Sequence, residues 1–305
     1  MAFVTRVTQL ATSLRYRLAA RTYRRSPAWQ AHPHNRPPQP ARWKDVHAAV
    51  EAAARNGGIP FDELRLRREE FQEFTRAFPL PPWSLYALRC REKKLMEHHI
   101  AFRLLGLRPG QRYIDIASEN SPFPEVARKR AGVDAYSQDL SYPPGVRGRQ
   151  IGSNAAALPI EAAWADAASL HCAFEHFAGD ADSGFIREMA RVLKPGGKCV
   201  IVPLYVGPQH LNLYDPLLPD GWDVTRRDPG ATVVAEIELG GHFERVYAPE
   251  TLSRILIPGL GLSYHLFHVT GAEDAFTTLS DAAREMLARI RFVLLIEKDQ
   301  RSGAI

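Results

Sequence analysis

Cysteine is scarce in this chain of 305 residues, and long apolar runs are missing. The three cysteines (Cys90, Cys172 and Cys199) lie far apart, and none belongs to a C-x-x-C pair. This spacing argues against a disulfide framework or a structural zinc site and favours a reducing compartment, the cytoplasm. No stretch reaches the roughly 18 apolar residues that a membrane span needs. Arginines interrupt every apolar stretch near the N-terminus, so we also expect no secretory signal.

Acidic residues are absent before Asp45, whereas Arg and Lys are frequent there. The basic residues of this segment are Arg6, Arg15, Arg17, Arg21, Arg24, Arg25, Arg36, Arg42 and Lys44. Because the whole chain has a formal net charge of +5, the remainder is mildly acidic. The basic character therefore belongs to the N-terminal segment, and a general nucleic-acid-binding surface on the body is not expected.

Residues 2–25 have apolar side chains near helical spacing with arginines between them. Three interpretations fit this pattern: a helix that contacts a membrane surface or a partner, a transit peptide, or a solvated tail. Residues 26–41 contain five prolines, Pro27, Pro33, Pro37, Pro38 and Pro40, which predict an extended linker. We therefore treat 1–41 as a basic helix followed by a linker.

The rest of the chain alternates helical and β-rich segments. Helices are predicted at 42–55, 61–77 and 84–106, followed by a strand at 112–117, a helix at 123–131, strands at 134–139 and 165–171, a helix at 182–193 and a strand at 198–205. An irregular insertion, 207–246, precedes a helix at 249–256, a strand at 262–269, a helix at 273–288 and a strand at 291–297. This order predicts an α/β fold with a mostly parallel sheet, whose ligands bind at the carboxyl ends of the strands.

Four segments carry a family resemblance: YIDIASENSPFP, SNAAALP, WADAASLHCAFEHF and the LKPGG turn that follows E-x-x-R-V. In this order they resemble the class I S-adenosylmethionine-dependent methyltransferases over residues 95–206, and the closing strand pair extends the resemblance to about 297. The resemblance implies a Rossmann-like sheet of seven strands, with the last strand inserted antiparallel. It also implies three regions: 1–41, a helical extension over 42–94, and a methyltransferase domain over 95–305, in which 207–246 forms a substrate lid.

The cofactor-binding positions also follow from the resemblance. Asp115 matches the acid of the first motif and would hold the loop backbone, or the cofactor's amino group through water. Asp139 matches the carboxylate that accepts both ribose hydroxyls, and Asp134 is its competitor, at a shorter spacing. Asn154 takes the place of the acid that receives the adenine amino group, while Ala155 would touch the adenine ring.

The first motif lacks its glycines. Ala117, Glu119 and Ser121 stand at the three positions where the family has glycine for a close approach of the backbone to the ligand. Ala117 and Ser121 add little volume. Glu119 either binds a cationic group, such as the ammonium of the cofactor, or obstructs the pocket.

Two histidines are candidates for the catalytic base. His171 ends the fourth core strand, and it is either a base or a structural, hydrogen-bonded histidine. His176 and Glu175 form the family's E-H pair, whose simpler role is to orient the loop over the cofactor. The spacing of His171, Cys172, Glu175 and His176 does not match a known zinc motif, so no metal site is predicted.

The sequence thus predicts a cytoplasmic enzyme, at most peripheral at the inner membrane surface. It would use S-adenosyl-L-methionine to methylate a hydroxyl of a small molecule, a glycan or a lipid-linked acceptor. His210 and His242 in the insertion are reserve bases. The alternative is a catalytically inactive methyltransferase-like scaffold. An NAD-dependent enzyme is disfavoured because no G-x-G-x-x-G follows the first strand.

Overall fold

The structure, a computed structural model, describes residues 15–16, 18–35, 42–77, 91–119, 121–217, 228, 230–237, 243–276 and 279–300. Within these residues a nine-stranded sheet has the strand order β1-β11-β12-β7-β6-β2-β3-β5-β4. Its strands, in chain order, are β1 (Phe61–Arg65), β2 (Arg112–Ile116), β3 (Asp134–Asp139), β4 (Gly145–Arg147), β5 (Gln150–Gly152), β6 (Ala165–His171), β7 (Leu193–Leu204), β11 (Leu262–Thr270) and β12 (Phe292–Lys298). The predicted Rossmann-like α/β fold is therefore confirmed, with more strands than the seven expected.

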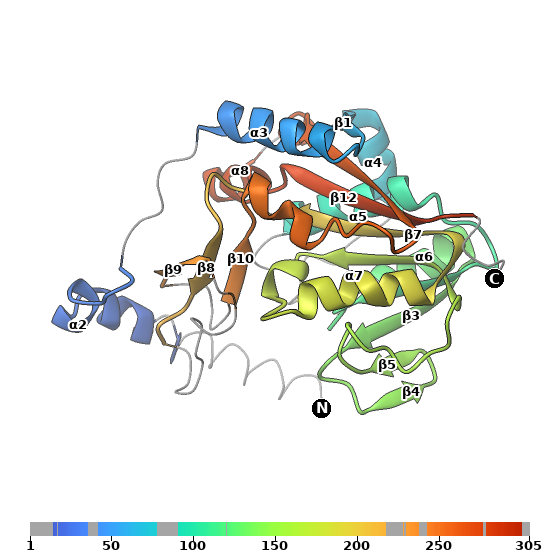
Figure 1. The fold of residues 1–305 in the computed structure, drawn as a ribbon, viewed down its shortest axis with the longest axis horizontal. Helices are drawn as coiled ribbons and strands as arrows, with labels where there is room; N and C mark the ends of the chain where they lie inside the picture. Colours follow the sequence, from blue (N-terminus) through green and yellow to red (C-terminus); the bar gives the residue numbers. More distant parts are fainter. Residues whose placement is uncertain are drawn as a thin grey trace.

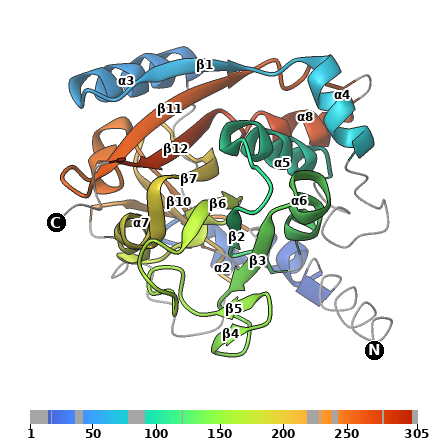
Figure 2. The same cartoon turned by 90° about the vertical axis from the view of Figure 1, so that its right-hand side faces the viewer.

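Helices cover both faces of this sheet (Figures 1 and 2). On one face lie α3 (Trp43–Asn56), α7 (Ala181–Val192) and the 3-10 helix η2 (Pro249–Arg254). On the other face lie α4 (Arg68–Ala77), α5 (Arg91–Leu105), α6 (Phe123–Ala131) and α8 (Asp281–Leu287). Each face has its own buried apolar cluster, so the central strands are apolar on both sides.

The strand directions bring the expected functional positions to one edge. Strands β2, β3, β5, β6 and β7 are parallel to one another. Strand β12 runs antiparallel between β11 and β7, and β4 runs antiparallel to β5. The carboxyl ends of β2, β3, β5, β6 and β7 consequently meet at the same edge of the sheet. This edge is called the strand-end rim below.

The segment 61–77 was predicted as one helix, and that prediction is wrong in its first half. Residues 61–65 form β1, which pairs in parallel with β11 at the sheet edge, and only 68–77 are helical. Leu64 and Leu66 are both buried, an alternation that suits a strand. The expected helical extension thus contributes a strand to the main sheet as well as helices.

The insertion 207–246 was predicted to be irregular, but it contains a second sheet of order β10-β8-β9. The strands are β8 (Leu211–Tyr214), β9 (Thr232–Ala235) and β10 (Phe243–Val246). The predicted helix 273–288 is shorter than expected: residues 272–275 form turns, and the helix is α8. The predicted helix 249–256 is the 3-10 helix η2.

The N-terminal segment contacts the second sheet. Residues 18–24 are helical, and the predicted linker contains the short helix α2 (Pro27–Gln30), capped by Ser26. The backbone N–H of Ala235 donates to the carbonyl of His34 over 2.9 Å. The predictions for residues 2–14, Cys90 and His242 lie outside the described residues. Among the described helices, none has the length and apolar character to cross a membrane.

Candidate functional site at the strand-end rim

The loop after β2 keeps a glycine-like backbone although it lacks glycine. Ala117 has φ 50° and Glu119 has φ 45°, in the left-handed region that L-residues adopt at a cost of about 1 kcal/mol each. The side chain of Glu119 is exposed. The tertiary structure therefore imposes on this sequence the loop conformation for which the family uses glycine.

Two residues of β3 hold this loop in place. Asp139 accepts the N–H of Glu119 through Oδ2 (2.9 Å), and it accepts the N–H and hydroxyl of Ser141 through Oδ1 (2.8 and 2.6 Å). Gln138 accepts the N–H of Ala117 (3.1 Å) and donates to the carbonyl of Ser153 (2.6 Å). Asp139 thus lies at the rim, where the sequence placed it, and it also supports the loop. Gln138 was missed, because a glutamine inside a strand gives no functional signal.

The residues assigned to the adenine ring lie after β5. The amide oxygen of Asn154 accepts the N–H of Ala156 over 2.9 Å, which forms a local turn. Ala155 and Leu158 are buried beside it. Asp134, the competitor of Asp139, lies at the opposite end of β3 and pairs with Arg149. The geometry therefore favours Asp139 over Asp134 as the rim carboxylate.

Asp115 and His171 form a buried pair at the ends of β2 and β6. The Nε2 of His171 is 3.5 Å from Oδ1 of Asp115 and 2.8 Å from the hydroxyl of Ser169. Burial raises the pKa of Asp115 to about 7, while Ser121 and Lys94 act in the opposite direction. Burial, with His98 and Lys94 nearby, lowers the pKa of His171 well below 6.5. The imidazole is therefore neutral at physiological pH.

The surroundings of His171 are those of a structural side chain. Its ring lies 4.7 Å from the ring of Phe123 and 4.9 Å from that of His98, and only 3% of its side chain is exposed. Asp115 is equally buried, and no hydrogen bond joins it to the loop backbone among the described residues. The loop N–H groups of Ala117 and Glu119 donate to Gln138 and Asp139, so the role of Asp115 toward the loop or the cofactor's amino group stays a prediction.

His176 is more accessible than His171. It belongs to the 3-10 helix η1 (Phe174–His176), and 33% of its side chain is exposed. Its Nδ1 lies 2.5 Å from the carbonyl oxygen of Phe243, which can only accept a hydrogen bond. The proton therefore sits on Nδ1, and Nε2, 3.8 Å from Oε1 of Glu175, is the basic nitrogen.

A buried polar cluster, unexpected from the sequence, lies behind η1. The ammonium of Lys93 lies 2.7 Å from Sγ of Cys172 and 2.9 Å from the hydroxyl of Tyr205. The thiol of Cys172 donates to Glu175 over 2.9 Å. Burial alone would lower the pKa of Lys93, but Glu97 and the other acidic groups nearby raise it well above its usual value. Burial raises the pKa of the Cys172 thiol to about 12, so this cluster holds a protonated lysine beside a protonated thiol.

Helix α5 supplies this lysine, which the sequence analysis did not single out. Lys93, Lys94 and Glu97 are 9% exposed or less, because α5 lies between the sheet and other helices. Lys94 donates to Glu97 (2.9 Å) and to the carbonyl of His171 (2.8 Å). Charged residues at this spacing are also typical of a solvated helix face. The only usable signal was that these side chains share one face of the helix.

His210, a reserve base in the sequence analysis, belongs to a different network. Its Nε2 lies 2.9 Å from Asp228, which also accepts from Nε of the fully buried Arg245 over 2.6 Å. Arg245 in turn lies 2.7 Å from Asp182, at the start of α7. This network ties the second sheet to the main domain, so His210 has a structural role.

The described side chains fit the cofactor that the family resemblance implies. Buried polar atoms without a hydrogen-bond partner among the described residues include both carboxylate oxygens of Asp115, Oγ of Ser153 and Nδ1 of His171. They follow β2, β5 and β6 at the rim. Asp139 is half-buried at the same edge. No group of three or more His, Cys, Asp or Glu side chains in the described part of the chain is arranged to hold a metal ion.

Known proteins similar to this chain were found among solved structures and in one family. Comparison with curated protein sequences gives no match. Among solved structures, the YcgJ protein of Bacillus subtilis is 16% identical with a TM-score of 0.39, covering 67% of this chain and 98% of its own. The 1,6-didemethyltoxoflavin-N1-methyltransferase of Burkholderia thailandensis, solved with its substrate and S-adenosylhomocysteine, is 13% identical with a TM-score of 0.43, covering 87% of this chain and 93% of its own.

The family comparison covers the part of the chain that carries most of the rim. Residues 106–201, from the end of α5 into β7, match the methyltransferase domain family. This range includes the loop after β2, Asp139, Asn154 and the E-H pair of η1. Residues 106–201 therefore carry a methyltransferase domain, as the sequence motifs predicted.

Proposed function

We propose that this protein methylates a hydroxyl group of a small-molecule, glycan or lipid-linked acceptor. The observation that carries the proposal is the loop after β2, which keeps its left-handed conformation at Ala117 and Glu119 and is held by Asp139. When bound, S-adenosylmethionine supplies a methyl group on a positively charged sulfur. The protein's task is then to orient the two reactants and to accept a proton.

Each rim residue has a role in this proposal. Asp139 uses its remaining acceptor capacity for the ribose hydroxyls, and Asn154 with Ala155 contacts the adenine. His176 accepts the proton of the acceptor hydroxyl at Nε2, because its tautomer is set by the carbonyl of Phe243. His171 stays neutral behind the rim and positions Asp115. The second sheet of the insertion serves as a lid over the acceptor.

Calorimetric titration with S-adenosylmethionine tests the cofactor site. We expect Asp139→Asn to weaken binding about tenfold or more, because a hydrogen bond to a charged group contributes about 1.5–3 kcal/mol. Asp134→Asn is the matched control, since it removes the same charge at the other end of β3. Equal losses in the two variants would exclude Asp139 as the ribose ligand.

An inactive scaffold is the second candidate, and the exposed carboxylate of Glu119 on a former glycine position favours it. The same titration separates the two. A wild-type chain that gives neither heat nor a thermal shift at millimolar S-adenosylmethionine is a scaffold. An active enzyme should bind S-adenosylmethionine even when no acceptor has been added, so the titration does not require the acceptor to be identified.

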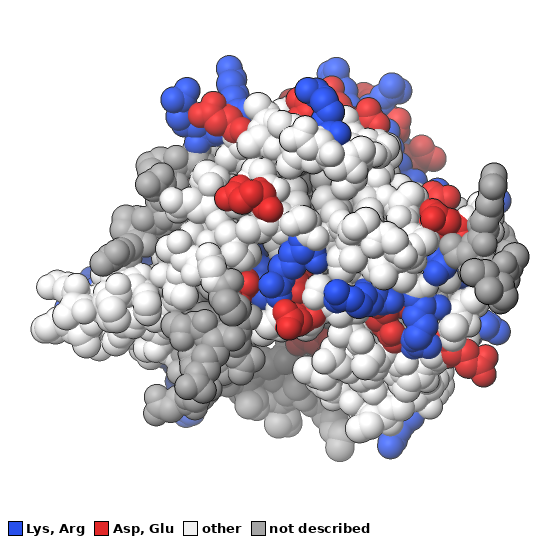
Figure 3. Space-filling model, in the orientation of Figure 1, with Lys and Arg blue, Asp and Glu red and all other residues white. Residues whose placement is uncertain are grey.

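We also propose that residues 2–25 bring the protein to the inner membrane surface from the cytoplasm, and that the body binds no nucleic acid. The segment is basic and acid-free, and Leu18 is 58% exposed. In contrast, the face of the body in Figure 3 carries acidic and basic side chains side by side. A basic amphipathic helix binds anionic lipid through both its charge and its apolar face.

Vesicle co-sedimentation checks this proposal. Deletion of residues 1–14 should lower binding to vesicles that contain anionic lipid and leave binding to neutral vesicles unchanged. It should also preserve the contact between His34 and Ala235, and hence the melting temperature. Equal sedimentation of the full and shortened chains with anionic vesicles would exclude a contribution of residues 1–14 to membrane contact.

A further inference from the structure

A cavity of about 480 Å³ opens beside the rim at the carboxyl end of β7. Its walls come from the end of β7 and the residues after it, from β8, and from the segment between α8 and β12. The lining is mainly apolar and includes Trp43, Leu204, Val206, Leu211 and Leu213. This size and character suit a small molecule with an apolar chain or ring.

Tyr205 places this cavity next to the reaction site. Its side chain lines the cavity, and its hydroxyl accepts from Lys93 over 2.9 Å. Lys93 contacts Cys172, the residue that follows the end of β6. The inner wall of the cavity thus adjoins the strand end at which the proposed base, His176, is also held.

Two arginines line the cavity, and their charges are balanced differently. The guanidinium of Arg289 is 2.5 Å from the carboxylate of Glu244 and stacks on the ring of Tyr205. Its charge is therefore already neutralised within the protein. The acidic residue of the lining, Glu285, is exposed to solvent.

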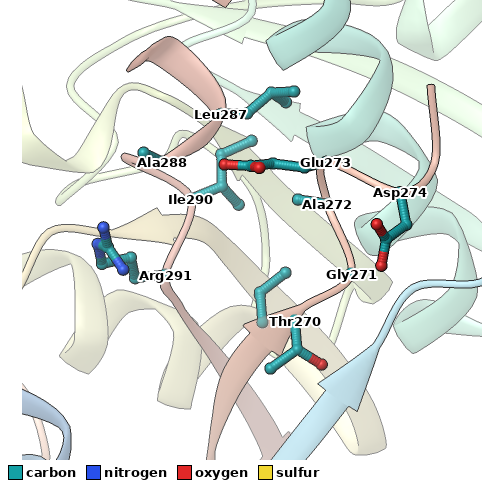
Figure 4. Close-up of a pocket in the computed structure, with 10 residues that line it drawn as sticks. Thr270, Gly271, Ala272, Glu273, Asp274, Leu287, Ala288, Ile290 and Arg291 are labelled. Atoms are coloured by element: carbon teal, nitrogen blue, oxygen red, sulfur yellow. The ribbon is translucent and has the colours of Figure 1, made fainter. Parts of the chain in front are cut away.

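Arg291 is compensated less directly: among the described residues no ion pair joins it to a carboxylate, and Glu273 acts on its charge only from a distance. Its guanidinium lies 3.9 Å from the ring centroid of Trp43, and its Nε is buried without a hydrogen-bond partner among the described residues. Arg291 also lines a second cavity of about 300 Å³ beside α8. In Figure 4 it extends to the side opposite Asp274. A buried donor without a partner is costly, and an anion would satisfy it.

We propose that the larger cavity is the acceptor site and that it takes an amphipathic acceptor whose single anionic group, a carboxylate or a phosphate, pairs with Arg291. The apolar part of the acceptor lies along Leu204, Val206 and Leu213. The hydroxyl to be methylated points past Tyr205 toward the end of β6. This assignment of the acceptor class rests on the proposed function.

Calorimetry with four ten-carbon probes on the full chain tests the proposal. Decanoate and decyl phosphate should bind, and their relative affinities distinguish carboxylate from phosphate recognition. Decanol and decyltrimethylammonium should bind at least tenfold more weakly, because they offer Arg291 no negative charge. Binding of decanol as tight as that of both anions would overturn the anion site, and failure of both anions to bind would overturn the whole assignment.

Two variants test whether the probes bind in the larger cavity beside Arg291. Arg291→Gln should weaken binding of the anions by about ten- to hundredfold, whereas Arg187→Gln, a matched change on the exposed side of α7, should leave it unchanged. Leu213→Trp fills the cavity and should weaken all four probes, which keeps the test informative if the Arg291 variant misfolds. Unchanged anion affinity in both Arg291→Gln and Leu213→Trp would contradict the proposal.

Titration of S-adenosylmethionine into the same proteins separates the two proposals. A wild-type chain that binds decanoate but not S-adenosylmethionine supports the cavity as an anion site and contradicts the proposed function. If the wild-type chain binds S-adenosylmethionine but no anionic probe, the proposed methyltransferase function is supported and the proposed acceptor class is contradicted.

Discussion

At the residue scale, the loop after β2 shows how far a local preference can be overridden. Ala117 and Glu119 occupy left-handed conformations that neither residue favours. Their N–H groups donate to the side chains of Gln138 and Asp139, and these hydrogen bonds, with burial of the flanking residues, offset that cost. Strain of this kind at a ligand edge is typical of functional sites.

Glu119→Gly should strengthen S-adenosylmethionine binding severalfold, because it removes a Cβ from the edge where backbone approaches the ligand. The free energy of unfolding should change by less than about 1 kcal/mol, since relief of the left-handed strain is offset by the greater freedom of glycine in the unfolded chain. Calorimetry and urea unfolding measure the two quantities.

Glu119→Gln is the control for the carboxylate, because it keeps the Cβ. If the carboxylate instead binds the ammonium of the cofactor, both variants should bind S-adenosylmethionine more weakly than the wild type. That outcome would refute the idea that Glu119 obstructs the site.

At the element scale, the second sheet is fixed to the main domain through buried charge. Arg245 of β10 is fully buried and contacts Asp182 of α7 and Asp228, and it donates to the carbonyls of Phe177 and Gly179. Tyr247 also donates to Asp182. The second sheet is therefore fixed to the main domain at this network, which limits its movement there.

Arg245→Met should lower the free energy of unfolding by about 3–5 kcal/mol, because it leaves the carboxylates of Asp182 and Asp228 buried without this partner. Urea unfolding at pH 7 measures the loss. Arg284→Met is the control: its ion pair with Glu273 spans 3.8 Å between half-exposed side chains and contributes less than about 1 kcal/mol. A loss at Arg245 no larger than that of the control would show that the network is dispensable.

At the scale of the whole molecule, α5 contributes two buried histidines: His98 packs against His171 at the end of β6, and His99 packs against two phenylalanines of α4. Burial lowers the pKa of His98 well below 6.5, and burial with Arg103 nearby lowers that of His99 to about 4. Each of these residues takes up a proton in the unfolded chain at a pH where the folded chain cannot. Acid therefore destabilises the fold through these two histidines.

His99 gives this effect a defined range of pH. Its pKa is about 4 when folded and 6.5 when unfolded, so its contribution to stability is complete above pH 6.5 and is lost as the pH falls toward 4. His99→Gln should therefore become less destabilising, relative to the wild type, by about 1.4 kcal/mol per pH unit between pH 6 and 4.5. Urea unfolding across pH 4.5–8 measures this difference, and parallel curves for the two proteins would contradict it.

Asp115 changes the stability of the fold with pH in the direction opposite to that of the buried histidines. Its folded pKa of about 7 exceeds that of an ordinary carboxyl, so the folded chain takes up a proton first and gains stability as the pH falls below 7. The net acid response of the molecule is the balance between this carboxyl and the buried histidines.

The sequence by itself determined the order of the main strands and helices and the identity of the fold, because apolar runs and the LKPGG turn are local signals that survive in a single chain. It also placed Asp139 and His171 at the carboxyl ends of strands. The tertiary structure alone decided that 61–65 joins the sheet edge, that 207–246 folds into a second sheet, and that Lys93 meets Cys172 and Tyr205. These contacts join residues far apart in the chain. They are stabilised by burial and charge pairing, which a local sequence pattern cannot predict.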